Sequence, residues 1–378
     1  MVDFTFTEEQ EMFRKAAREF AETVVAPKVD EMEETGQVSQ EIVKALAEAE
    51  LLGIIVPEEY GGLGLGHITR LIALEEIGRV SSAVAMMLQV FHLGIDPILA
   101  AGSEEQKKRY LPGLATGEKF ATVAVTEATG GSDPTGIRTE YTKAEGGYLL
   151  NGRKVFITNS HLADTVVVLA KSPDDPKSFS AFIVEEGMEG FKRGREENKV
   201  GMRGCNTGEL AFNQCFVPQE NLLGEENKGM RVVLGAIGEV GRAGMVGCAL
   251  GLHTACLEEA VKFANERILY GKPISRLQTI QNEIALMYMD LEASRLLGYR
   301  AAAMKDNGER CDLQFAVAKY YSTEAAIRAA KTAVDIHGGY GVMTEYAVQR
   351  YYRDAIVLGP SAGTSYIMKV IMARAALF

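Results

Sequence analysis

The stretch of sequence that decides the fold is Val125-Thr126-Glu127-Ala128-Thr129-Gly130-Gly131-Ser132-Asp133. It follows a short apolar run, residues 121–125, and consists mainly of small and hydroxyl-bearing residues after a strand-like end. Such residues let backbone N–H groups approach an anion or a flat heterocycle closely. Taken alone, the stretch fits a polar hairpin loop equally well, so its meaning depends on the segments that flank it.

Two helical regions flank a strand-rich one. Residues 1–118 place apolar side chains at helical spacing after a capping box at Thr7–Gln10. Residues 119–225 contain short apolar runs typical of strands, and Asn151-Gly152 predicts a hairpin turn. Residues 226–378 return to helical spacing. Helices, then strands, then helices predict an α+β chain whose three domains follow these boundaries.

The composition excludes several classes of protein. The 378 residues include 51 acidic and 40 basic ones, a net charge of −11, which argues against binding a nucleic-acid backbone. The 5 cysteines form no CxxC pair, so we expect free thiols in a reducing cytoplasm, with no metal site. We see no signal peptide and no apolar run near the roughly 20 residues that span a bilayer. Anionic small molecules remain compatible ligands through local basic patches.

Further segments carry specific chemistry in order along the chain. They are Phe156–Asn159, Arg267–Ile274 with Gln278, Asp335–Gly341, and Tyr352–Ala355 with Gly363–Ser365. In the Arg267 segment, an arginine precedes an aromatic residue, a glycine and a lysine. This arrangement suits a pyrophosphate, because a guanidinium binds phosphate with two parallel hydrogen bonds. Together with residues 125–133, these segments resemble the FAD-dependent acyl-CoA dehydrogenases over essentially the whole chain.

The resemblance implies a helical N-terminal domain, a β-barrel-like middle domain and a C-terminal four-helix bundle. It also implies FAD as cofactor, an acyl-CoA thioester as substrate, and an electron-transfer flavoprotein or similar electron acceptor. The family assembles as a homotetramer, a dimer of dimers, in which each FAD touches a neighbouring subunit. In the family's reaction a base removes the Cα proton and a hydride passes from Cβ to flavin N5.

Matching positions carry the family's contacts over to this chain. The flavin ring and ribityl chain would be surrounded by Val125, Thr126, Ser132, Phe156 and Thr158. A second group of cofactor contacts, which includes those reaching a neighbouring subunit's FAD, consists of Arg267, Tyr270, Gln278, Gly338, Gly339 and Thr364. The substrate side would consist of Gln89, Leu93, Ser132, Glu239, Arg242 and Gly363. The family usually has Gln and Phe where this chain has Asp335 and His337, and Asp335 also fits an ordinary surface helix.

The family's catalytic base is missing at both of its usual positions. It is a Glu directly before Gly-Thr-Ser, where this chain has Ala362, or directly before the substrate-side arginine, where it has Gly241. Alanine and glycine accept no proton, and a thioester α-proton is too weakly acidic to leave unaided. Three explanations stay open: binding of flavin and thioester without chemistry, another carboxylate such as Glu239, or removal of a proton other than the α-proton.

Asp96 is the candidate base for the third explanation. Gln89, His92, Leu93 and Asp96 have the spacing of one helix face, and the resemblance implies that this helix lines the acyl pocket. The alternative is a solvent-facing carboxylate at a helix C-terminus, just before Pro97. His92, one turn earlier, would orient Asp96 or tune its pKa, or else is a packed histidine.

A pocket carboxylate displaced from Cα suits an α,β-unsaturated thioester, because conjugation makes the γ-proton acidic. Hydride loss from another allylic carbon would complete a 1,4-elimination. This pattern resembles the cyclohex-1-ene-1-carboxyl-CoA dehydrogenases of anaerobic aromatic degradation, which form cyclohexa-1,5-diene-1-carboxyl-CoA, lack the usual Glu and use an Asp. The alternatives are an ordinary short-chain, branched-chain or cyclohexanecarboxyl-CoA α,β-dehydrogenase with an unrecognised base, and an inactive flavin- or CoA-binding paralogue.

Overall fold

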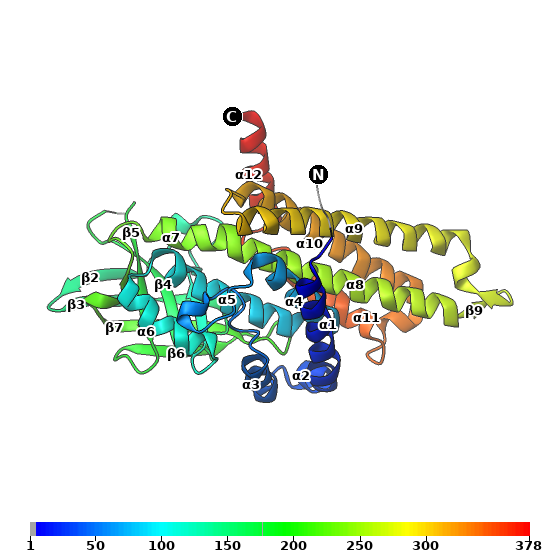
Figure 1. Ribbon diagram of the computed structural model, residues 1–378, viewed down its shortest axis with the longest axis horizontal. Helices are drawn as coiled ribbons and strands as arrows, with labels where there is room; N and C mark the ends of the chain where they lie inside the picture. The colour runs from blue at the N-terminus through cyan, green and yellow to red at the C-terminus, as the bar shows by residue number, and fades with distance from the viewer. Residues whose placement is uncertain (1–4, 176) are drawn as a thin grey trace.

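The strand-rich and helical parts of the chain are arranged along one long axis (Figure 1). The structure is a computed structural model that describes residues 5–175 and 177–378. The sheet lies at one end of the molecule, and long C-terminal helices run from it to the other end, with the N-terminal helices packed beside them. The observed order of helices, strands and helices confirms the predicted α+β class.

The N-terminal helices begin at the predicted capping box, where Gln10 N donates to Thr7 Oγ1 at 3.2 Å. They are α1 (Glu8–Phe20), α2 (Val29–Thr35), α3 (Gln40–Glu48), α4 (Gly66–Val80), α5 (Ser82–Ala101) and α6 (Glu104–Ala115). The whole of α5 up to Ile95 is buried, and it packs against α4, β1 and α8. This helix therefore forms the centre of the N-terminal region and carries four of the predicted site residues.

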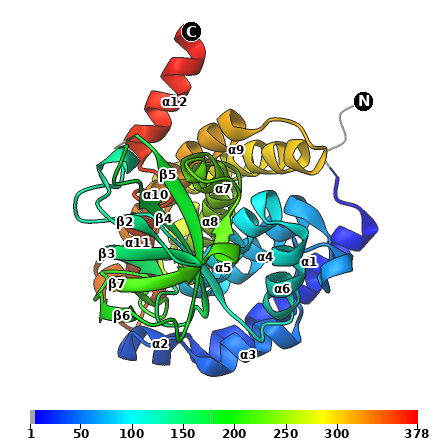
Figure 2. The same ribbon diagram turned by 90° about the vertical axis from the view of Figure 1, so that its left-hand side faces the viewer.

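One mixed sheet forms the middle of the chain, seen from its end of the molecule in Figure 2. Its strands are β1 (Ala121–Ala124), β2 (Glu140–Ala144), β3 (Gly147–Thr158), β4 (Thr165–Lys171), β5 (Phe179–Glu185), β6 (Phe191–Glu196), β7 (Thr207–Pro218) and β8 (Leu222–Leu223). The strand order is β6-β7-β3-β2-β4-β5-β8, and β1 pairs in parallel with β4. The rings of Tyr141, Tyr148 and Phe182 pack edge-on or tilted against one another within its own apolar core.

The predicted hairpin turn at Asn151-Gly152 is wrong. Both residues lie inside β3, and the turn between β2 and β3 is at Glu145-Gly146, where Gly146 has a φ of 76°. Asn151 Oδ1 instead accepts from the backbone N of Gln214 at 2.8 Å, where the register of β3 against β7 shifts. Long-range pairing with β7 overrides the local turn preference, so the pair marks a bulge.

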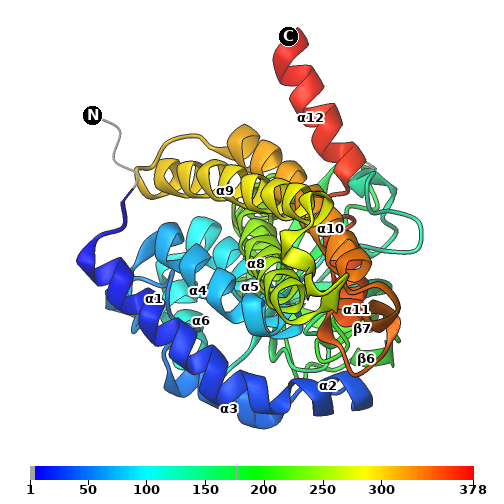
Figure 3. The ribbon, with the colours of Figure 1, turned by 90° about the vertical axis from the view of Figure 1, so that its right-hand side faces the viewer.

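The C-terminal helices form the predicted bundle, which Figure 3 shows end-on. They are α7 (Gly229–Ala236), a π-helical segment (Ile237–Gly241), α8 (Arg242–Glu266), α9 (Gln278–Asp306), α10 (Asp312–His337), α11 (Ala347–Leu358) and α12 (Ser365–Leu377). A two-stranded hairpin, β9 (Ile268–Leu269) and β10 (Lys272–Pro273), joins α8 to α9. Helices α8, α9, α10 and α11 are the four members of the bundle, whereas α12 projects away from it.

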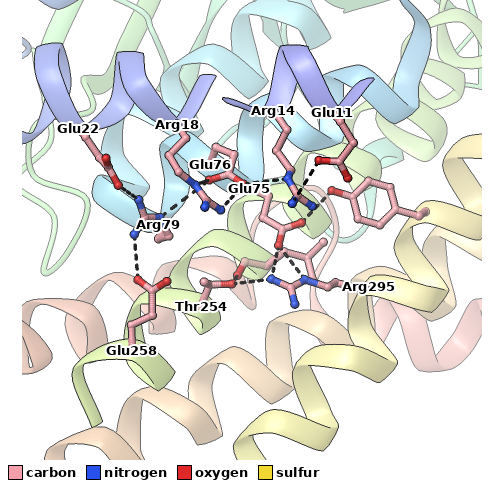
Figure 4. Close-up of polar contacts among 12 residues, drawn as sticks. Glu11, Arg14, Arg18, Glu22, Glu75, Glu76, Arg79, Thr254, Glu258 and Arg295 are labelled. Carbon is pink, nitrogen blue, oxygen red and sulfur yellow. Dashed lines mark hydrogen bonds and ion pairs between the residues drawn. The ribbon is translucent and has the colours of Figure 1, made fainter. Parts of the chain in front are cut away.

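A network of ion pairs fixes α4 to three other helices (Figure 4). Glu76 accepts from Arg18 of α1 at 2.8 Å, and Arg79 donates to Glu258 of α8 at 3.0 Å. Glu75 accepts from Arg295 of α9 at 2.8 Å. Because Glu75 and Glu76 are both buried, breaking one of their ion pairs lowers the free energy of unfolding more than breaking a surface pair does.

Two helices correct the expectation that no segment is long and apolar enough to span a bilayer. Ser82–Ala101 and Gly229–Glu266 pass that test by length and composition, with mean hydropathies of 1.6 and 1.4. Most of each is buried inside the fold, 83% and 67% of the respective window. This burial is typical of core helices, whose apolar length contacts other helices instead of lipid.

Candidate functional site

The two positions where the base is missing lie next to each other. A Cβ built on Gly241 would lie 3.6 Å from Ala362 Cβ and 3.5 Å from both methyl carbons of Leu93. These residues come from the π-helical segment, from the turn before α12 and from α5, three parts that are distant in sequence. A Glu at either position would therefore reach the same place, and in this chain that place is apolar.

Asp96 lies in the interior of α5, which continues through Pro97 to Ala101. The alternative of a carboxylate at the helix end is thus wrong, and the side chain is only partly exposed. Burial raises the pKa of Asp96 to about 6; the charges of Lys305 and Arg70 act against this shift, and the charge of Glu239 adds to it. A carboxylate with this pKa is ionised at neutral pH and basic enough to accept a proton.

His92 and Gln89 belong to a buried hydrogen-bond network. His92 Nδ1 accepts from Arg70 Nε at 3.2 Å, and its Nε2 lies 3.0 Å from Leu51 O. Both ring nitrogens are thereby used, and burial lowers the pKa of His92 well below its usual value. Gln89 Nε2 donates to Gly241 O at 3.4 Å. This arrangement favours a packed, neutral histidine over a catalytic one, and places Gln89 as a support of the π-helical segment.

The two remaining substrate-side candidates carry charge. Glu239 accepts a hydrogen bond from the ammonium of Lys305, on α9. Arg242 donates to Asp312 O at 3.3 Å, its buried Nε finds no hydrogen-bond partner among the residues that the structure describes, and burial lowers its pKa. Sequence reasoning missed Lys305, because nothing in its local sequence shows that α9 places it beside the π-helical segment.

The first group of cofactor candidates gathers around the end of β1 and the bulged end of β3. Val125 is buried there, Thr126 and Thr158 are partly buried, and Ser132 is exposed. Phe156 has a φ of 58° and is 64% exposed, because β3 shifts register against β7 at this point. An exposed ring beside hydroxyl and backbone donors fits a flavin, for which an aromatic face offers stacking.

Glu127 holds the loop that begins this cofactor group. Its carboxylate accepts from Lys154 Nζ at 2.7 Å and from the backbone N of Arg138 and Thr139 at 2.6 and 3.0 Å. Lys154 is fully buried and also donates to Val125 O at 3.0 Å. The motif's glutamate is therefore a structural part of the loop, and its backbone also exchanges two hydrogen bonds with Gly130.

Except for Thr364, which precedes α12, the second group of cofactor candidates lies at the other end of the molecule, around the β9–β10 hairpin (Figure 1). Tyr270 is 89% exposed with a φ of 50°, and the Arg267 guanidinium lies 5.3 Å from the Tyr340 ring centroid. A Cβ at Gly338 or Gly339 would meet open space, so this backbone is accessible to a ligand. Gln278 is exposed, as a contact to another subunit requires.

Asp335 and His337, the two residues that differ from the family pattern, have different surroundings in the structure. Asp335 is an exposed helix residue that accepts from Lys331 Nζ at 2.7 Å, which favours its surface role. His337 is buried, stacks on Phe263 at 4.1 Å between ring centroids, and is 2.8 Å from Ala333 O through Nδ1. Thr364 Oγ1 caps α12 by accepting from Ile367 N at 3.3 Å.

The three-part fold, the exposed Phe156 ring beside the β1–β3 loops and the apolar contact of Gly241, Leu93 and Ala362 are typical of a flavin-dependent dehydrogenase. The chain belongs to the acyl-CoA dehydrogenase family, whose N-terminal, middle and C-terminal domain models match residues 7–118, 122–215 and 227–377. FAD is the cofactor of this family, and the chain's oxidation chemistry is that of CH–CH bonds in acyl-CoA thioesters.

Individual relatives match nearly end to end. An acyl-CoA dehydrogenase of Bacillus subtilis (strain 168) is 42% identical, covering 97% of this chain and 98% of that protein. A subunit of the caffeyl-CoA reductase–Etf complex of Acetobacterium woodii is 39% identical, covering 97% of this chain and 98% of its own length. The structure of butyryl-CoA dehydrogenase from Megasphaera elsdenii superposes with a TM-score of 0.98 at 35% identity, covering 100% of both chains.

Proposed function

We propose that the protein converts cyclohex-1-ene-1-carboxyl-CoA to cyclohexa-1,5-diene-1-carboxyl-CoA by 1,4-elimination, with Asp96 as the base. The observation that carries this proposal is the apolar contact of Gly241, Ala362 and Leu93, with a partly buried Asp96 of pKa about 6 one turn after Leu93 on α5. Because no carboxylate can extend from residue 241 or 362, the wall there suits a ring carbon of the substrate. The titratable group that α5 offers with a suitable pKa is Asp96, whose charge interacts with those of Lys305 and Glu239.

In this reaction the Asp96 carboxylate takes a γ-proton from the conjugated thioester, and a hydride leaves from the other allylic carbon. One C–H bond breaks heterolytically at each carbon, and the ring gains one C=C bond. FAD, when bound, supplies the acceptor for the hydride. The positive charges of Lys305 and Arg70 stabilise the ionised form of Asp96 before the proton arrives.

Anaerobic mixing of the FAD-loaded protein with thioesters tests the proposal. We expect cyclohex-1-ene-1-carboxyl-CoA to bleach the flavin, and Asp96→Asn to abolish bleaching while FAD stays bound. Asp30→Asn, a fully exposed Asp on α2, is the matched control and should bleach as the wild type does. Bleaching by butyryl-CoA or cyclohexanecarboxyl-CoA alone would indicate an ordinary α,β-dehydrogenase, and bleaching by none would indicate a binding protein.

The same proposal includes an oligomer, because one chain carries two halves of a cofactor site at opposite ends. The β1–β3 group and the β9–β10 group complete one site only if a second copy brings its hairpin to the first. A homotetramer, a dimer of dimers, fits the apolar side chains exposed on α9, which include Leu286, Met289 and Leu296. The Etf-associated relative supports an electron-transfer flavoprotein as acceptor, and we place the protein in the cytoplasm.

A further inference from the structure

The turn between α11 and α12 has an unusual backbone. It runs from Gly359 to Thr364 and carries the vacant base position, Ala362. Ala362 and Gly363 both have positive φ values, 51° and 93°. A left-handed conformation is unfavourable at a non-glycine residue, so the surrounding structure must hold this turn in place.

Lys319 of α10 holds both ends of the turn. Its side chain is fully buried, and its Nζ donates to Gly359 O at 2.7 Å and to Gly363 O at 2.9 Å. Gly359 directly follows α11, where the carbonyl ends of the helix collect partial negative charge. One ammonium group thus joins the end of α11 to the residue after Ala362.

Burying the Lys319 ammonium is unfavourable, and packing of its side chain alone does not explain why a lysine is present. Its hydrogen bonds within the described part of the chain go to two backbone carbonyls, and burial lowers its pKa to about 8, against the charge of Glu324 and with that of Arg242. Removing an ammonium from water costs several kcal/mol. Methionine would fill nearly the same volume without that cost, so the two hydrogen bonds to the turn explain why a lysine is present.

The opposite wall of the pocket is held in the same way. Arg70 is fully buried, and its Nη1 donates to Val240 O at 3.1 Å, within the π-helical segment. Gln89 donates to the next carbonyl, that of Gly241. Room for both exists only because residue 244 is glycine: a Cβ there would lie 2.1 Å from Gln89 Cγ and 2.7 Å from Arg70 Nη2.

We propose that Lys319 is a positioning residue that fixes the Gly359–Thr364 turn, so that Ala362 and Gly363 form one wall of the acyl site against Gly241. Arg70 fixes the facing wall. The role of this wall in turnover depends on the proposed function, whereas the hold of Lys319 on the turn does not.

Lys319→Met tests the proposal with two measurements. Hydrogen exchange should speed up about tenfold in peptides covering residues 359–368, because the turn loses both bonds to Nζ. In anaerobic single turnovers with cyclohex-1-ene-1-carboxyl-CoA, the limiting rate of flavin reduction should fall about 10- to 100-fold, with half-saturation changed less than about threefold. The rate should change more than the half-saturation concentration, because the turn would contact the reacting carbons whereas the CoA contacts stay intact.

Three further variants make the result interpretable. Lys319→Arg keeps charge and donors and should recover most of the rate. Gly363→Ala strains the same turn at a φ of 93° with Lys319 intact, and should change the rate and the half-saturation concentration in the same way even if Lys319→Met fails to fold. Lys199→Met is the matched control: Lys199 also donates to a backbone carbonyl, that of Cys205, but in the middle domain. It should leave the rate unchanged.

Wild-type exchange and a wild-type rate in Lys319→Met would overturn the proposal. So would faster exchange spread evenly over α10, α11 and α12, because that result describes general loosening. If the wild-type protein is reduced by no thioester, the proposed function fails, and hydrogen exchange alone then decides whether Lys319 holds the turn.

Discussion

Single residues decide the chemistry under the proposed function. Alanine at 362 and glycine at 241 leave both positions of the family's base without a carboxylate, and Leu93 contacts Gly241 there. Asp96 remains as a carboxylate, and burial raises its pKa above that of an exposed aspartate. The proposed reaction therefore depends on four residues within an otherwise ordinary fold.

The rate of flavin reduction should depend on pH through Asp96. The pKa of Asp96 is raised to about 6, and a general base acts only when ionised. The rate should therefore rise with pH, reach half its maximum near pH 6, and level off above it. Stopped-flow traces from pH 5 to 8 check this, and Asp96→Asn should lose about 100-fold or more in rate together with the acidic limb. A limb that persists in the variant would assign the titration to another group.

Ala362→Glu should gain Cα,Cβ dehydrogenation of a saturated thioester. The glutamate adds no backbone strain, since Ala362 already has a φ of 51°, and its carboxylate would extend toward the space between Gly241 and Leu93. Bleaching by cyclohexanecarboxyl-CoA measures the gain, and Ala362→Gln is the control that fills the same volume without a base. No difference between the two variants would mean that Cα does not face residue 362.

At the scale of elements, the sites depend on how α4, α5 and the π-helical segment are held together. A π-helical turn within a helix is often found at functional sites, and here Arg70 and Gln89 donate to two of its carbonyls. Helices α4 and α8 approach so closely that a Cβ at Gly251 would lie 2.5 Å from Glu75 O. The wall formed by the π-helical segment is therefore held by packed helices, whereas the facing wall is the turn that Lys319 holds.

Arg295→Met should lower the free energy of unfolding by about 2–4 kcal/mol, because it leaves Glu75 buried without its cation. Tyr299 would be the remaining partner, through its hydroxyl at 2.8 Å from Glu75 Oε2. Denaturant unfolding measures the loss. The double variant Glu75→Gln/Arg295→Met should recover much of it, since no buried charge then lacks a partner. Equal losses in both variants would show that packing of Arg295, and not its charge, stabilises α9 on α4.

For the whole molecule, the separation of the two cofactor groups links assembly to cofactor retention. Leu286, Met289 and Leu296 lie on one face of α9 and are each at least half exposed. The double variant Leu286→Glu/Met289→Glu should yield smaller particles in light scattering and release FAD on gel filtration, because each site would lose the neighbouring hairpin. Lys44→Glu, at an exposed position of α3, changes the net charge by the same amount and should keep both properties. A monomeric variant that retains FAD would show that one chain holds the cofactor.

The sequence by itself determined the family, the three-part order of helices and strands, and the absence of a glutamate at 241 and 362. These features are linear: capping boxes, apolar spacing and motif order depend on neighbours along the chain. It misplaced the Asn151-Gly152 turn, because pairing of β3 with β7 decided that backbone.

Only the tertiary structure decided which groups face one another. It brought Gly241, Leu93 and Ala362 together, used both nitrogens of His92, and kept α5 helical past Asp96. It also buried Arg70 and Lys319 against backbone carbonyls. The physical reason is that burial and hydrogen-bond partners arise from packing between segments far apart in the chain, which no local pattern of residues specifies.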